Sequence, residues 1–288
     1  NIKNNHLVIM AGGVGSRFWP MSTPDYPKQF IDVLGCGRTL ILTTADVLGD
    51  LSSGKYLGGD IREDADTVKE QLPDIADDHI LRGLAVANGS LYSIRQLENK
   101  ARNPKANMVV TPSDHIVMNI AEFQRVINSA IEFTADSDAI LTLGMKPTRP
   151  ETGYGYIEAD LSVPSTANKE VFRVYSFKEK PDLETARRYI QKNNFFWNAG
   201  IFVWNVNTVV NAARNQPAIS KVFERLLPYY YTDKEQEMID RNFPLCENIS
   251  VDYAIMEKRM RFLSFLPALG GVIWVLGIIA REFAERCP

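Results

Sequence analysis

The residues best suited to chemistry lie in a glycine-rich stretch near the start of the chain. An apolar run over residues 7–10 leads directly into Ala-Gly-Gly-Val-Gly-Ser-Arg, and a lysine follows at position 28. Glycines let a backbone turn sharply and bring its N–H groups close to an anion, usually a phosphate. A forked arginine and a mobile lysine add positive charge. We predict that a nucleoside triphosphate is bound by Ala11, Gly12, Gly13, Gly15, Ser16, Arg17 and Lys28.

Other interpretations of this loop remain open or are excluded by its sequence. A tight turn between a strand and a helix, without a ligand, is the simplest alternative. The loop is not a Walker A motif, because no Gly-Lys-Ser/Thr follows the glycines. It is also a poor dinucleotide fingerprint, because Pro20 and Pro24 interrupt the helix that should follow.

A carboxylate that suits a metal ion follows a second apolar run, residues 107–110. This run ends in Thr-Pro-Ser-Asp-His, with the aspartate at position 114. Ligands of α/β sheets lie at the carboxyl ends of strands, and Mg²⁺ prefers one or two carboxylates together with phosphate oxygens. We therefore predict that Asp114 binds Mg²⁺. The alternative is that Asp114 only caps the helix that follows.

Further polar residues suit a sugar phosphate. Glu179 is placed to accept hydrogen bonds from hydroxyl groups and Lys180 to hold a phosphate, although a solvated charge run is the usual reading. The amide of Asn198 suits a sugar hydroxyl, or else holds a turn together. Gly153 lets the backbone approach a sugar, or else kinks a strand.

The composition excludes several classes of protein. The chain has 288 residues, 45% hydrophobic and 23% charged, with a net charge of −3. These values are ordinary for a globular protein, and the charge gives no footprint for nucleic acid. The three cysteines and three histidines lack the spacing of a zinc site or a disulfide framework. We expect a cytoplasmic protein with neither nucleic acid nor membrane as a partner.

The elements that must position these residues alternate along the chain. Strand-like runs occupy residues 7–10, 107–110, 139–143, 153–158 and 171–178. Helices are predicted over residues 39–47, 64–72, 121–135, 183–192, 206–215, 219–227 and 233–242, with clear helical spacing of apolar residues in 121–135. This alternation predicts an α/β fold, a three-layer sandwich around a mainly parallel, mixed central sheet.

In this order the motifs resemble those of the mannose-1-phosphate guanylyltransferases, which are sugar-phosphate nucleotidyltransferases. The resemblance covers most of the chain. It rests on the glycine loop continued as Phe18-Trp19-Pro20, on Tyr26-Pro27-Lys28-Gln29-Phe30, on Pro112-Ser113-Asp114-His115, on residues 152–157, on Phe177-Lys178-Glu179-Lys180-Pro181, on residues 197–202 and on residues 250–258.

The resemblance implies a glycosyltransferase-A-like catalytic domain over residues 1–288, without the family's small C-terminal domain. GTP and mannose 1-phosphate would give GDP-mannose and pyrophosphate, with Mg²⁺ held by Asp114. Arg17, Lys28 and Asp114 would be the catalytic residues. Gly153, Glu179, Lys180 and Asn198 would contact mannose 1-phosphate. Alternatives remain for the substrate, which could carry another base or sugar, and for the activity, since the chain could be a catalytically impaired homologue that only binds a sugar nucleotide. A homodimer also remains open.

Three segments, 47–62, 82–100 and 264–280, depart abruptly from the family pattern. Codons can be chosen for residues 88–100 that, shifted by one base, encode Thr-Ala-Pro-Cys-Ile-Ala-Tyr-Ala, a motif of the family. The same test restores family-like sequence in the other two segments. We hypothesise compensated reading-frame slips, with genuine divergence as the alternative; the intact mass of the protein would distinguish them.

The third segment bears on metal binding and on the membrane. Residues 263–280 carry no charge and approach the length of a membrane span, but a shifted frame makes them a strand and a turn. The shifted motif has an Asp where the chain has Ile273, and the resemblance implies that this Asp is a second Mg²⁺ ligand. With Ile273 as written, we expect weakened metal binding.

Overall fold

A computed structural model describes residues 2–11, 21–23, 25–52, 54–59, 65–82, 103–214, 221, 224–229, 232–242, 262–266 and 273–275. The strands are β1 (Asn5–Met10), β2 (Gly54–Gly59), β3 (Ile80–Arg82), β4 (Asn107–Pro112), β5 (His115–Val117), β6 (Ile140–Met145), β7 (Tyr156–Pro164), β8 (Val171–Lys178), β9 (Phe195–Asn205), β10 (Phe262–Phe265) and β11 (Ile273–Val275). The α-helices are α1 (Leu40–Gly49), α2 (Ala65–Gln71), α4 (Ile120–Ala135), α5 (Leu183–Gln191), α6 (Val206–Arg214) and α8 (Glu235–Asn242). Short 3-10 turns are η1 (Ile2–Asn4), η3 (Lys28–Phe30), η4 (Asp77–His79) and η5 (Leu227–Tyr229).

The central sheet has the order β3-β2-β1-β4-β9-β6-β10-β8-β7. Strands β1 to β4 of this sheet run parallel, and β9 runs antiparallel to both β4 and β6. Strand β7 also pairs with β9, so β9, β6, β10, β8 and β7 close into a small ring of strands. The predicted α/β fold with a mixed sheet is therefore confirmed. Among the described strands of this sheet the parallel pairs are those of β3, β2, β1 and β4 and the pair of β6 with β10, whereas the remaining pairs are antiparallel, so the sheet is less parallel than predicted.

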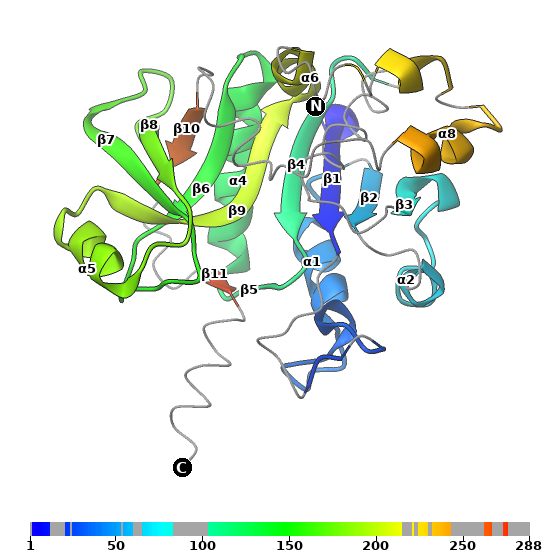
Figure 1. The fold of residues 1–288 in the computed structure, drawn as a ribbon, viewed down its shortest axis with the longest axis horizontal. Helices are drawn as coiled ribbons and strands as arrows, with labels where there is room; N and C mark the ends of the chain where they lie inside the picture. Colours follow the sequence, from blue (N-terminus) through cyan, green and yellow to red (C-terminus); the bar gives the residue numbers. More distant parts are fainter. Residues whose placement is uncertain are drawn as a thin grey trace.

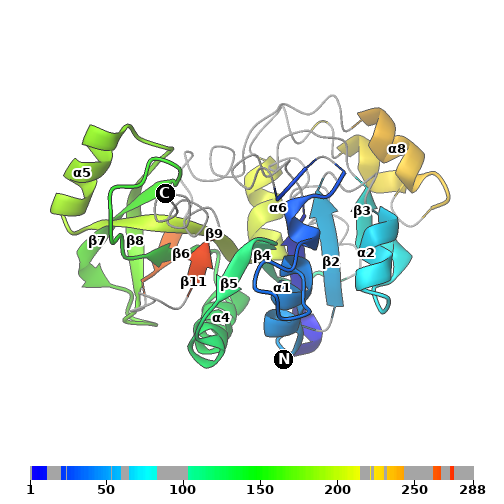
Figure 2. The ribbon, with the colours of Figure 1, turned by 90° about the horizontal axis from the view of Figure 1, so that it is seen from below.

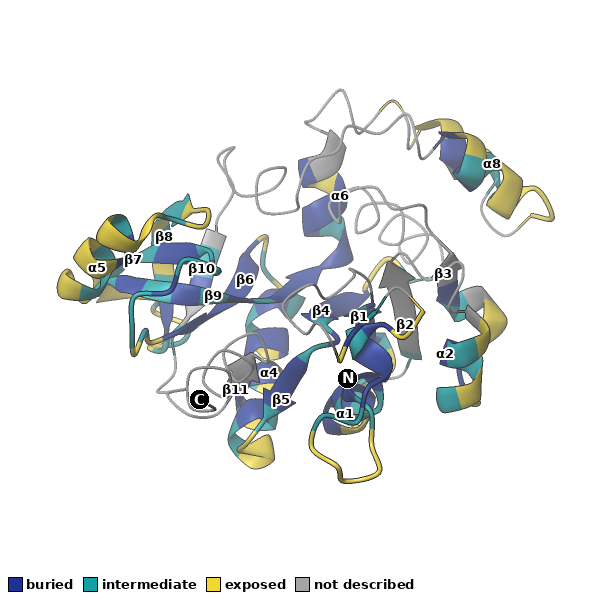
Figure 3. Cartoon of the chain, turned by 60° about the horizontal axis from the view of Figure 1, so that its bottom comes forward, coloured by how far each residue is buried: buried dark blue, intermediate teal, exposed yellow. Residues whose placement is uncertain are grey.

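Helices cover both faces of the sheet and make the three layers (Figures 1 and 2). Helices α1 and α4 lie on one face and α6 lies on the other, and the burial colouring of Figure 3 shows dark blue strands between them. Strands β1 and β4 are buried almost throughout, as expected for parallel strands covered on both faces. Strands β1 and β4 thus form part of the core, and the site residues that follow them lie at its border.

Helix α4 shows how local sequence sets an element's limits. Its buried residues follow helical spacing, and its N-cap is Asn119, whose side chain accepts a hydrogen bond from the backbone N–H of Glu122. The alternative role for Asp114 as the cap of this helix is therefore wrong. Asp114 is left for other chemistry.

Two of the three segments that depart from the family pattern contribute strands as written. Strand β2 pairs in parallel with β1, with Tyr56 opposite Val8. Strands β10 and β11 lie within or beside the uncharged run, and no helix of the described ranges is long and apolar enough to cross a membrane. Strand β2 therefore forms without a shifted frame. The hypothesis of frame slips stays a prediction, and most of residues 82–100 lies outside the described residues.

Gly144 in β6 occupies a crowded position. A Cβ there would clash with Cδ2 of Leu266 and would lie 2.9 Å from Oγ of Ser264 and 3.2 Å from Cβ of Phe196. We expect G144A to lower the free energy of unfolding by about 1–3 kcal/mol, because overpacking displaces neighbours on two sides.

Gly155 offers a matched control for G144A, measured by urea denaturation. A Cβ at Gly155 would meet only the ring of Phe177, at 2.5 Å from Cζ, and that half-buried ring can swing aside. We expect a smaller loss for G155A. Equal stability of G144A and wild type would contradict this account of the packing at β6.

Candidate active site

The described part of the site begins at two adjacent strand ends. Met10 of β1 pairs with Pro112 of β4, and the N–H of Ser113 donates to the carbonyl of Met10 at 3.2 Å. Ala11 is buried at the end of β1, and Asp114 follows β4. Parallel strands therefore bring the start of the glycine loop and the predicted metal ligand to one edge.

The rest of the glycine loop lies outside the described residues. The roles predicted for Gly12, Gly13, Gly15, Ser16 and Arg17 stay predictions for that reason.

Lys28 and Asp114 form an ion pair at this edge. Lys28 Nζ lies 2.5 Å from Asp114 Oδ2, and the two side chains are 19% and 17% exposed. Lys28 opens the turn η3, which follows Pro27 in an extended conformation. The tertiary structure thus joins two predicted site residues that lie 86 positions apart in the sequence.

The Lys28 ammonium keeps Asp114 ionised. Burial raises the pKa of the Asp114 carboxyl, whereas the charges of Lys28 and His115 lower it. The lowering effects together outweigh the effect of burial, so the pKa lies below the ordinary value. Burial also lowers the pKa of His115, although Asp114 opposes that effect. At neutral pH the site therefore contains the Asp114 carboxylate, paired with Lys28, and a neutral His115 imidazole.

The donor chemistry at Asp114 fits Mg²⁺. An ionised carboxylate is a hard oxygen ligand, and Mg²⁺ binds through one or two carboxylates while keeping waters and substrate phosphates. Within the described ranges, no group of three or more His, Cys, Asp or Glu side chains forms a cage for a metal ion. Asp114 would therefore supply one protein ligand, with phosphate oxygens completing the coordination.

Strand β11 brings the C-terminal part of the chain beside Asp114. It pairs antiparallel with β5, placing Val275 opposite His115 and Ile273 opposite Val117 (Figure 2). The position where the family pattern expects a second acidic ligand thus lies on the strand next to the one that follows Asp114. The written residue is Ile273, which has no group that binds Mg²⁺.

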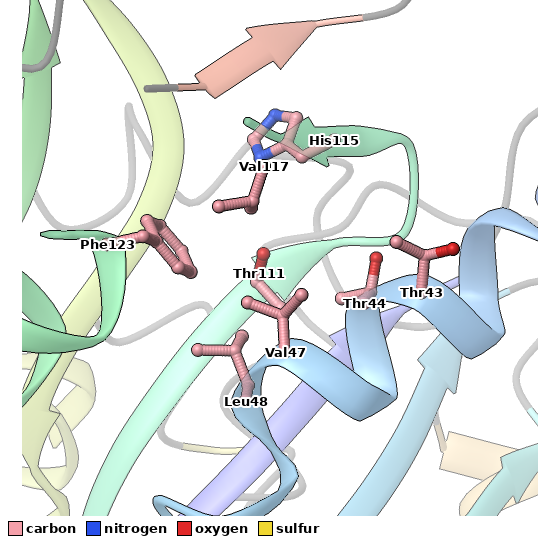
Figure 4. Close-up of a pocket in the computed structure, with 8 residues that line it drawn as sticks. All are labelled: Thr43, Thr44, Val47, Leu48, Thr111, His115, Val117 and Phe123. Atoms are coloured by element: carbon pink, nitrogen blue, oxygen red, sulfur yellow. The ribbon is translucent and has the colours of Figure 1, made fainter. Parts of the chain in front are cut away.

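A cavity behind β5 does not fit a charged substrate. Figure 4 shows its lining from α1, β4, β5 and α4, namely Thr43, Thr44, Val47, Leu48, Thr111, His115, Val117 and Phe123. The lining is largely apolar and lacks the cations that a triphosphate needs. Asp114 is not among the residues that line this cavity, and we assign the cavity no substrate.

The predicted sugar-phosphate residues gather on three neighbouring strands. Tyr156 of β7 pairs with Lys178 of β8 and with Trp197 of β9. The next row along the strands therefore holds Asn198, Gly155 and Glu179, and the N–H of Asn198 donates to the carbonyl of Gly155 at 2.8 Å. The structure thus places Asn198 and Glu179 in one row, on either side of Gly155.

The two charged residues after β8 are loosely paired. Lys180 Nζ lies 3.6 Å from Glu179 Oε1, and their side chains are 58% and 34% exposed. An ion pair between groups this exposed contributes little to stability. Because both side chains are exposed, both are accessible to a ligand.

A buried carboxylate that the sequence did not single out shapes the loop before β7. Glu151 is 7% exposed, and its Oε1 accepts hydrogen bonds at 3.1 Å from the N–H groups of Thr152 and Gly153. The N–H of Gly153 is therefore used within the protein, so its predicted sugar contact has to use its carbonyl or its lack of a side chain. The one signal in the sequence that could have drawn attention to Glu151 is its position directly before the Thr152-Gly153 motif.

Known proteins match the chain over most of its length. Residues 6–243 match the nucleotidyl transferase family. Mannose-1-phosphate guanylyltransferase of Salmonella montevideo is 32% identical over 257 residues, and mannose-1-phosphate guanylyltransferase 2 of Escherichia coli O157:H7 is 34% identical over 261 residues. Each match covers 87% of this chain and 54% of the relative, so the chain spans about half the length of these relatives.

Solved structures support the same relationship. The crystal structure of mannose-1-phosphate geranyltransferase from Thermus thermophilus matches with a TM-score of 0.78 and 27% identity, over 95% of this chain and 76% of that chain. A UDP-glucose pyrophosphorylase complexed with UDP-glucose shares the fold, with a TM-score of 0.55 and 14% identity over 99% and 100% of the two chains. The predicted resemblance is confirmed: the chain belongs to the nucleotidyl transferase family.

Proposed function

We propose that the chain transfers GMP from GTP to mannose 1-phosphate and releases pyrophosphate. The observation that carries this proposal is the Lys28–Asp114 pair at the carboxyl edge of the sheet. It combines a phosphate-binding cation with a metal-binding carboxylate, as nucleotidyl transfer requires. The choice of GTP and mannose 1-phosphate rests on the relatives named above, which are 32% and 34% identical.

The residues at this edge divide the work of the reaction. Asp114 would hold Mg²⁺, which when bound neutralises the charge of the triphosphate. Lys28 exchanges the carboxylate for phosphate oxygens when the nucleotide binds, since its ammonium has three donors. Asn198 and Glu179 orient mannose 1-phosphate, whose phosphate oxygen attacks the α-phosphorus in line while pyrophosphate leaves. Positioning and charge neutralisation carry the catalysis, and no covalent enzyme intermediate is needed.

Pyrophosphate release with a panel of substrates tests the proposal. Each of the four nucleoside triphosphates is combined with mannose 1-phosphate, glucose 1-phosphate or no sugar, in the presence of Mg²⁺. We expect the highest kcat/KM for GTP with mannose 1-phosphate. A clear preference for another base or sugar would assign the chain to another sugar-1-phosphate nucleotidyltransferase activity.

Ile273 favours a second candidate, a sugar-nucleotide-binding homologue with impaired catalysis. In that case GTP binds, as seen by calorimetry, but pyrophosphate release stays at background. The variant I273D then separates the two candidates, because it restores the carboxylate that the resemblance implies as a second Mg²⁺ ligand, and Mg²⁺-dependent turnover would rise. An intact mass equal to that of the written sequence would establish that Ile273 is present in the protein.

A further inference from the structure

The side chain of Asn198 is held in one orientation by contacts that the proposed mechanism does not use. Its Oδ1 accepts a hydrogen bond from Thr142 Oγ1 at 2.7 Å and another from the N–H of Gly200 at 3.2 Å. We infer that Thr142 is a positioning residue that locks the Asn198 amide with its Nδ2 hydrogens available to the sugar phosphate. This inference rests on the proposed function.

The direction of each hydrogen bond follows from its chemistry. The backbone N–H of Gly200 can only donate, so the side-chain atom it reaches must be the carbonyl oxygen of Asn198. The Thr142 hydroxyl must then donate its single hydrogen to the same oxygen. Its other contact, to the carbonyl of Ile201 at 3.2 Å, is longer and secondary. A flipped amide would place two donors against each other at Gly200.

The backbone around Asn198 is built to present this amide. Thr142 pairs with Phe202, whereas Gly144 pairs with Asn198, so β9 bulges between these positions. Gly200 within the bulge has a φ of 70°, which favours glycine. Thr142 itself is fully buried in β6 at 0% exposure. A rigid strand therefore holds the hydroxyl against the base of the bulge.

The two hydrogen bonds to Asn198 Oδ1 determine which ligand atoms Asn198 can bind. Two donors already bind Oδ1. The amide can therefore bind a ligand through its two Nδ2 hydrogens, which suit phosphate or hydroxyl oxygens. Glu179, in the same row on the far side of Gly155, offers only acceptors when ionised, and it suits hydroxyl hydrogens. The row therefore presents a donor and an acceptor on either side of Gly155, and Thr142 assigns the donor role to Asn198.

Four variants measured alongside wild type test this role: T142V, T142S, N198A and the double variant T142V/N198A. Valine keeps the shape of threonine but removes the hydroxyl, whereas serine keeps the hydroxyl. We expect T142V to raise KM for mannose 1-phosphate about five- to tenfold, as for one lost hydrogen bond. The values of kcat and of KM for GTP should stay within about twofold, because the lost contact affects sugar-phosphate binding alone.

The double variant separates positioning from a general structural role. We expect T142S to restore wild-type KM and T142V to add nothing when Asn198 is already alanine, since Thr142 acts through that amide. An equal KM increase in both backgrounds would overturn the inference, as would a wild-type KM in T142V.

A second readout does not depend on turnover. The side-chain amide of Asn198 can be followed by ¹⁵N NMR, where its heteronuclear NOE reports how rigidly the side chain is held. We expect T142V to lower this NOE and T142S to keep it. If wild type releases no pyrophosphate with any substrate, the proposed function fails, while an unchanged NOE in T142V would separately overturn the positioning role.

Discussion

Replacement of Asp114 by asparagine is expected to lower kcat/KM by about a hundred- to a thousandfold. Asparagine keeps the size of the side chain but removes the negative charge, and metal charge stabilisation of this kind supplies several kcal/mol. Asp114 is ionised at neutral pH because Lys28 holds its pKa below the ordinary value despite burial. The variant therefore removes a charge that is present at neutral pH.

Steady-state pyrophosphate release over a Mg²⁺ titration measures this effect, and calorimetry with Mn²⁺ and GTP tests metal binding directly. The matched control is D46N, because Asp46 is an exposed aspartate on α1 that pairs with Arg38 outside the site. We expect D46N to stay within about twofold of wild type. A D114N enzyme with more than a tenth of wild-type activity would remove Asp114 from the catalytic assignment.

Replacement of Lys28 by methionine has two expected effects. Methionine keeps the apolar stem of lysine but loses the ammonium, so we expect KM for GTP to rise about tenfold or more, as for loss of a hydrogen bond between charged groups. Asp114 is then left largely buried without its counter-ion. We expect the free energy of unfolding at neutral pH to fall by about 2 kcal/mol.

The pH dependence of that stability loss identifies its origin. A carboxyl whose pKa is lowered on folding stabilises the protein above its unfolded pKa, and this contribution disappears as the pH falls through the folded pKa. The difference in unfolding free energy between wild type and K28M should therefore be largest at neutral pH, where Asp114 is ionised in both proteins. It should begin to narrow as the pH falls through the Asp114 pKa of K28M, which burial raises once Lys28 is gone, and it should go on narrowing down to the lowered Asp114 pKa of wild type.

Urea denaturation at several pH values checks this profile. The matched control is K105M, because Lys105 is exposed and lies before β4, at the opposite end of that strand from Asp114. K105M should show neither the change in KM nor the pH-dependent loss. A stability difference for K28M that persists unchanged at pH 3 would show that the loss comes from packing rather than from the ion pair.

Local patterns predicted much of the fold. The apolar run at 107–110 is the core of β4, and the helical spacing at 121–135 is α4. These predictions succeed because burial repeats with the period of the backbone. The short strands β3, β5, β10 and β11 gave no such signal, since three or four residues are too few to show a period.

The sequence by itself determined the family, the alternation of strands and helices, and the residue types at the strand ends. It also offered two roles for Asp114 and for Asn198. Only the tertiary structure showed that Asn119 rather than Asp114 caps α4, that Lys28 pairs with Asp114, and that Thr142 and Gly200 donate to the Asn198 oxygen. The physical reason is the separation of the interacting residues along the sequence. Periodicity involves neighbouring residues, whereas charge pairing and hydrogen-bond direction depend on groups that meet only when the sheet forms.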